Sequence, residues 1–132
     1  MPKLILLDTN FLMIPAQFRV DIFSEIRRIC DFSYELAVVQ ATVDELNRIA
    51  AGKGREKAAA LLALRLIKAK NIRIISSKTA SFKNADKVLL DVAAKKRDSI
   101  VVATQDMALK AGLKKLGTSV IVLRQKKYLS LG

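Results

Sequence analysis

Short apolar runs alternate along this chain with segments of helical spacing, and this alternation limits the possible folds more than any other feature. Five runs have the pattern of buried strands: 3–7, 35–39, 72–75, 99–103 and 119–123. Parallel strands are joined by helical crossovers and need helices on both faces. The alternation therefore predicts an α/β fold with a parallel sheet of about five strands and helices on both faces.

The segments between the runs have the apolar spacing or the end signals of helices. We expect helices over 20–30, from Thr42 to near Gly52, and over 55–70, 84–97 and 106–116. The centre of the third, 58–64, carries no charge and must be largely buried. At 132 residues the chain is long enough for one core, so we expect a single domain over 1–132.

Two residue types are scarce enough to exclude whole classes of site. Cys30 is the single cysteine, which rules out a disulfide framework or a cysteine-based zinc site. The absence of histidine removes Ser-His-Asp and Cys-His mechanisms. The first apolar run is too short for a signal peptide or a membrane span. We therefore expect a cytoplasmic protein without a membrane partner.

Charge is distributed unevenly along the chain. The net charge is +12, with 24 Lys and Arg against 12 Asp and Glu. Residues 1–50 hold five basic and seven acidic residues, whereas residues 51–132 hold nineteen and five. A basic majority indicates a polyanionic partner such as RNA, although a high lysine content can also serve solubility.

Four acids fall at the places where a parallel sheet would bring them together. Asp8 follows the first strand, Glu45 begins the helix after the second, and Asp106 follows the fourth, just after Thr104. Asp86 lies at the start of a helix whose N-terminus should share that edge. Packed carboxylates repel one another unless a cation compensates. Oxygen ligands suit magnesium or manganese.

The order of these acids resembles that of the PIN-domain nucleases. Asp8-Thr9-Asn10 resembles the opening motif of that family, and Glu45 in Val43-Asp-Glu-Leu resembles its second acid. Asp86 lies seven residues before a small helical residue, as in the third motif. Thr104-Gln-Asp106 at a strand end is similar to the fourth. The ordered set covers residues 4 to about 123.

The resemblance implies a PIN-like fold and an endoribonuclease, usually a homodimer, that depends on Mg²⁺ or Mn²⁺. It implies that the four acids are catalytic, that the three aspartates hold one or two ions, and that Glu45 binds metal directly or through water. Asn10 and Thr104 would orient a ligand or a water. The turn Gly52-Lys-Gly-Arg-Glu-Lys57, followed by an Ala/Leu-rich helix, looks more like archaeal stand-alone PIN proteins. Those proteins resemble both VapC-type toxins and the PIN domains of ribosomal-RNA-processing factors. A cognate antitoxin or a ribosomal precursor is therefore an implied partner.

Each candidate residue also has a structural explanation. Asp8 and Asp106 could cap helices, and Asp86 could be an acid in the first turn of its helix. Thr42-Val-Asp-Glu45 has the form of a capping box. Asp91 competes with Asp86 but falls in the middle of its helix.

The function and the RNA-binding surface also have alternatives. The basic run Lys53, Arg55 and Lys57 is either an RNA contact or a solvated turn. At the level of function, the alternative is a non-catalytic RNA-binding or ribosome-assembly module. A phosphotransfer reaction is disfavoured because Asn10 stands where a second aspartate is expected.

Overall fold

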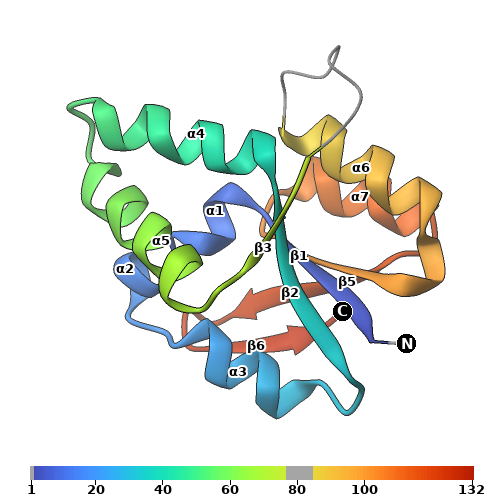
Figure 1. Cartoon of the computed structure of the whole chain (residues 1–132). Helices are drawn as coiled ribbons and strands as arrows, with labels where there is room; N and C mark the ends of the chain where they lie inside the picture. The colour runs from blue at the N-terminus through green and yellow to red at the C-terminus, as the bar shows by residue number, and fades with distance from the viewer. Residues whose placement is uncertain (1, 77–84) are drawn as a thin grey trace.

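The computed structural model of the chain describes residues 2–76 and 85–132, and it confirms the α/β fold. In those residues a six-stranded sheet has the order β3-β2-β1-β4-β5-β6 (Figure 1). Its strands are β1 (Lys3–Leu7), β2 (Tyr34–Val39), β3 (Arg73–Ile75), β4 (Ile100–Ala103), β5 (Ser119–Arg124) and β6 (Tyr128–Leu131).

Helices connect most of these strands. They are α1 (Thr9–Leu12), α2 (Ile14–Phe18), α3 (Ile22–Ile29), α4 (Gln40–Ala51), α5 (Lys57–Ala69), α6 (Ala85–Lys95) and α7 (Met107–Lys115). The predicted helix over 84–97 corresponds to α6, which ends at Lys95 and is followed by a 3-10 turn over Arg97–Ser99; Asn84 lies outside the described residues. Within the part of the chain that is described, no helix has the length and apolar character needed to cross a bilayer.

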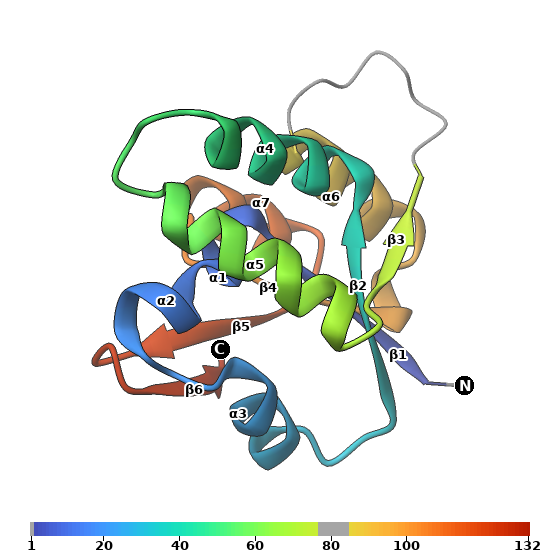
Figure 2. The same ribbon diagram turned by 60° about the vertical axis from the view of Figure 1, so that its left-hand side comes forward.

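Strand β1 lies at the centre of the sheet and is buried on both faces. It pairs in parallel with β2 and β4, and its side chains alternate between two cores. Ile5 and Leu7 face the core that contains α3 and α5, whereas Leu6 faces the core formed with α6 and α7. Figures 1 and 2 show these two helix pairs on opposite sides of the sheet. Burial on both faces explains why the strand is a continuous apolar run.

The five expected parallel strands are present, and a sixth strand that was not expected extends the sheet. β6 is antiparallel to β5 and forms an edge of the sheet. The turn between them has Gln125 and Lys126 at φ 52° and 56°. Turns with positive φ usually contain Gly, Asn or Asp, so Gln125 and Lys126 do not indicate a hairpin.

The expected capping box at Thr42 is wrong. Helix α4 begins two residues earlier, at Gln40, because β2 runs directly into it, and its N-cap is Val39 without a side-chain hydrogen bond. Thr42 is therefore in the helix interior and is fully buried. Its hydroxyl has no hydrogen-bond partner among the described residues. Glu45 is thus not a capping residue.

Replacing Thr42 by valine tests this correction. Thr42→Val keeps the side-chain shape and removes a buried unpaired hydroxyl, so we expect the free energy of unfolding to stay unchanged or to rise by about 1 kcal/mol. Asp21→Ala is the control, because Asp21 caps α3 by accepting from the amides of Phe23 and Ser24; it should lose about 1 kcal/mol. Urea denaturation measures both variants. If Thr42→Val lowered the free energy of unfolding by more than about 1 kcal/mol, Thr42 would have to be regarded as a capping residue after all.

Candidate active site

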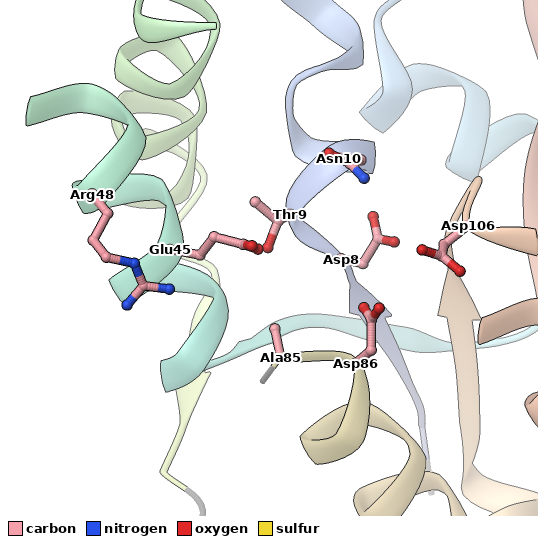
Figure 3. Close-up of a pocket in the computed structure, with 8 residues that line it drawn as sticks. All are labelled: Asp8, Thr9, Asn10, Glu45, Arg48, Ala85, Asp86 and Asp106. Atoms are coloured by element: carbon pink, nitrogen blue, oxygen red, sulfur yellow. The ribbon is translucent and has the colours of Figure 1, made fainter. Parts of the chain in front are cut away.

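A cleft of about 470 Å³ opens at the C-terminal edge of the parallel strands. Figure 3 shows that its side chains come from four parts of the fold, with the carboxylates of the three aspartates gathered together and Glu45 on the other side of Thr9. The residues that line it are Asp8, Thr9, Asn10, Glu45, Arg48, Ala85, Asp86 and Asp106. All four predicted acids therefore lie in one cleft.

Asp8 lies at the bottom of this cleft with 3% of its surface exposed. It directly follows β1 and is the N-cap of α1, where Oδ1 accepts a hydrogen bond of 2.7 Å from the amide of Phe11. Its Oδ2 accepts from the hydroxyl of Thr104. The capping role considered for Asp8 is therefore real, and it coexists with a position in the cleft.

Thr104 lies behind the cleft and does not line it. The residue is fully buried; its hydroxyl donates to Asp8 and accepts a 3.0 Å bond from the amide of Asp106. One hydroxyl group thus fixes two of the predicted acids relative to each other. The role expected from the resemblance, orienting a ligand or a water, does not fit this placement; Thr104 positions the acids instead.

Asp106 is held by its own helix and by the neighbouring strand. It is the N-cap of α7 and accepts a 2.8 Å bond from the amide of Leu109. The preceding residue, Gln105, donates to the carbonyl of Leu123 on β5 and accepts from its amide. The loop that carries Asp106 is therefore bonded to β5 through Gln105 and to α7 through Asp106 itself.

Asp86 and Glu45 approach the cleft from helices. Asp86 is in the first turn of α6, as the structural explanation allowed, and is half-buried. Glu45 is in the second turn of α4. Asp44 points away and accepts from the side chain of Gln40. Asp91 pairs with Lys95 at 3.1 Å and does not line the cleft.

The acids influence one another electrostatically. Burial raises the pKa of Asp8 from 3.8 to about 6, against the opposing effect of its hydrogen bonds to Thr104 and Phe11; the charges of Asp86 and Asp106 raise it further. Burial also raises the pKa of Asp86, and Asp106 and Glu45 add to that shift. The acids of the cleft therefore disfavour one another's charged forms, and a bound cation would relieve this repulsion.

The donor set fits a hard divalent cation. Residues 2–76 and 85–132 contain no group of three or more carboxylate or thiol side chains that could hold a metal ion as they stand. Magnesium does not require such a group, because it keeps several waters and is bound through one or two carboxylates together with substrate phosphates. The four carboxylates around the cleft can supply the one or two ligands that magnesium needs.

Two polar residues of the cleft were not singled out from the sequence. Thr9 is buried, and its hydroxyl has no hydrogen-bond partner among the described residues. Arg48 lies three residues after Glu45 on α4, and Figure 3 shows its side chain at the outer side of the cleft. The i,i+3 spacing puts both on one helix face, a signal that could have identified Arg48. Nothing in the sequence marks Thr9 apart from its place in the Asp8 motif.

The basic run of the α4–α5 turn does not line the cleft. Lys53, Arg55 and Lys57 are exposed. The turn between α4 and α5 lies at the end of α4 that is farther from the sheet (Figure 1). Asn10, in contrast, does line the cleft and is exposed.

Comparisons with known proteins agree with this geometry. Residues 5–126 match the protein family described as PIN like domain. The chain is 35% identical over 127 residues to ribonuclease VapC4 of Methanocaldococcus jannaschii, covering 94% of this chain and 92% of that protein.

Solved structures show the same fold at lower identity. The PIN domain endonuclease Utp24 superposes with a TM-score of 0.83 and 18% identity, over 98% of this chain and 91% of that one. A domain of a functionally unknown protein from Methanocaldococcus jannaschii gives a TM-score of 0.61 and 19% identity, over 92% and 91% of the two chains.

The raised pKa of Asp8 predicts how stability depends on pH. The folded state holds the Asp8 proton more tightly than the unfolded state, so in metal-free buffer the contribution of Asp8 to the free energy of unfolding falls as pH rises from about 4 to 6. The lowered pKa values of Asp21 and Glu25 act in the opposite direction, equally in wild type and in the Asp8 variant. The shift of Asp8 corresponds to about 3 kcal/mol. Asp8→Asn should remove this contribution. A smaller decrease in the free energy of unfolding with pH should remain, because the pKa of Asp86 is also raised.

Urea denaturation between pH 4 and 7.5 measures that slope. The slope is compared, and not the stability at one pH, because the substitution also changes the hydrogen bonds to Phe11 and Thr104 and so alters stability at every pH. Asp44→Asn is the matched control, since Asp44 faces away from the cleft, and it should keep the wild-type slope. Equal slopes in wild type and Asp8→Asn would show that Asp8 is not a buried repelled carboxylate.

Proposed function

The chain belongs to the PIN-like domain family, and from that premise we propose that it is an endoribonuclease that uses Mg²⁺ or Mn²⁺. One observation supports this most: four carboxylates from four separate elements line one cleft, and the most buried of them has a pKa raised by burial and by two of the others. Such a cluster destabilises the fold unless it binds a cation. The relative that is most informative about activity is a ribonuclease.

In this proposal Asp8, Asp86 and Asp106 hold one or two ions, and Glu45 binds directly or through water. The ion would lower the pKa of a water and neutralise charge on the phosphate. The protein fixes the acids beforehand through the hydroxyl of Thr104 and the amides of Phe11 and Leu109.

Uncharged and basic side chains complete the proposed site. The hydroxyl of Thr9, which has no partner among the described residues, and the exposed amide of Asn10 would hydrogen-bond to a substrate oxygen or a water. Arg48 would contact a phosphate next to the one that is cleaved, because a guanidinium group pairs well with phosphate. Lys53, Arg55 and Lys57 would bind the RNA backbone further away.

The partners follow from the relatives and remain part of the proposal. RNA is the substrate class of the ribonuclease relative. A toxin paired with an antitoxin and a nuclease acting on a ribosomal precursor are both compatible with the site. A homodimer, a cytoplasmic location and a single domain over 1–132 stay predictions.

Cleavage of RNA in defined metals tests the proposal. Purified protein should cut single-stranded or structured RNA with Mg²⁺ or Mn²⁺, and EDTA should abolish cutting. Ca²⁺ should support little cleavage, because its looser coordination orients the reacting groups poorly. Mg²⁺ should also raise the melting temperature of wild type and do so less in Asp106→Asn. RNA binding without cleavage would favour the non-catalytic alternative, and equal cleavage in EDTA would exclude a metal mechanism.

Replacing Glu45 separates its charge from its packing. Because Glu45 does not cap α4, Glu45→Gln should change the free energy of unfolding by less than about 0.5 kcal/mol. It should still slow cleavage by about 10-fold or more, the size of one lost electrostatic contact at the transition state. Asp44→Asn, one residue earlier on another helix face, should cleave like wild type. Single-turnover rates well below the melting temperatures provide the comparison, and a wild-type rate in Glu45→Gln would remove Glu45 from the site.

A further inference from the structure

A second groove, of about 290 Å³, lies between α7 and β5. Its apolar floor includes Val120 and Val122 on the face of β5 that α7 covers. Three basic side chains line it: Lys110, Lys114 and Arg124. Ala111 and Gly132 complete its lining. No acidic side chain lines this groove in the described part of the chain, so its charged side chains are opposite in sign to the acids of the catalytic cleft.

The groove and the catalytic cleft are lined by neighbouring residues at the start of α7. Asp106, which lines the cleft, caps this helix, and Met107 is the first helical residue and lines the groove. Along the helix axis Lys110 is about 6 Å and Lys114 about 12 Å from Asp106. The two lysines share one helix face at i,i+4 spacing. They therefore form a row of positive charge that leads away from the acids.

The basic groups of the groove are available to a ligand. None of the three takes part in a salt bridge between described residues. Arg124 is exposed, and its Nε donates to the hydroxyl of Ser130 at 3.3 Å, which orients the guanidinium group. Met107 has 75% of its surface exposed at the end of the groove nearest the cleft. A large apolar side chain so exposed beside basic groups suits a ligand with both phosphates and flat apolar surfaces.

We propose that this α7–β5 groove binds the single-stranded RNA that extends from the catalytic cleft. The proposal rests on the proposed function, and it identifies where the substrate lies outside the cleft. Lys110, Lys114 and Arg124 contact successive phosphates, while unpaired bases contact Met107 and the apolar floor. An RNA duplex fits less well, because its bases are stacked inside the helix and offer no faces to an apolar floor.

Equilibrium binding in EDTA tests the groove without requiring cleavage. A fluorescein-labelled single-stranded RNA is titrated with wild type, Lys110→Ala/Lys114→Ala and Arg65→Ala/Lys68→Ala. The last variant removes the same charge from exposed positions on α5. Alanine favours helix at all four positions, so each variant should fold.

The α7 variant should bind about 10-fold more weakly at 0.1 M salt. The slope of log affinity against log salt should fall by about 1.4, for two lost contacts to a single strand. The α5 variant should stay within about twofold of wild type. Met107→Ser should lower affinity severalfold at an unchanged slope, because it removes an apolar contact and no charge. Wild type should prefer the single strand to the same sequence in a duplex.

Equal losses in the α7 and α5 variants would assign the affinity to overall charge and overturn the proposal. Poly-glutamate of the same charge that bound as tightly as RNA, and weakened equally in the α7 variant, would assign the groove to acidic peptide segments and also overturn it. Loss of RNA binding in the α7 variant of a protein that cleaves nothing would leave the groove in place and remove the nuclease proposal. The two proposals can thus fail separately.

Discussion

The parallel pairing of β1 with β4 is the constraint on which the site depends. Its register places Leu7 opposite Ala103, so the next residues of the two strands, Asp8 and Thr104, emerge side by side. The amide of Asp8 still bonds to the carbonyl of Ala103 at 3.1 Å. A slip of one residue would turn Leu6 and Leu7 to the wrong cores and separate Asp8 from the Thr104 hydroxyl. Burial of β1 on both faces therefore fixes the geometry of the acids.

Sequence patterns predicted the parts of the fold that are determined by burial. The five parallel strands are apolar runs because both their faces are covered, and the four acids follow from the topology of such a sheet. The edge hairpin and the start of α4 were missed or misplaced for local reasons. Gln125 and Lys126 adopt positive φ without the usual residues, and Thr42 has the sequence of a cap but is placed inside the helix by the length of β2.

The sequence predicted which acids form the site but not how they are positioned relative to one another. Spacing along the chain showed that the acids could meet. It did not show that Thr104 lies behind Asp8 and Asp106, or that Arg48 shares a helix face directed at the cleft. A polyanion can approach four carboxylates only when positive charge lies between or beside them. Arg48 is the basic residue among the described side chains that line the cleft. Lys110 and Lys114 follow Asp106 along α7, on the other side of the cleft from Arg48 (Figure 3).

The hydrogen bonds of Asp8 and Asp106 also make the two sides of the cleft differ in the conformational entropy that their side chains lose when a ligand binds. Both carboxylates are already fixed in one rotamer by backbone amides, so a ligand loses little side-chain freedom by binding them. Ordering a side chain that was not fixed beforehand costs about 0.5–1.5 kcal/mol. Glu45 extends from a helix surface and is more exposed than Asp8, so this entropic cost falls mainly on its half of the cleft. Asp8 and Asp106 thus keep their positions when a ligand binds, and the side chain of Glu45 adjusts to it.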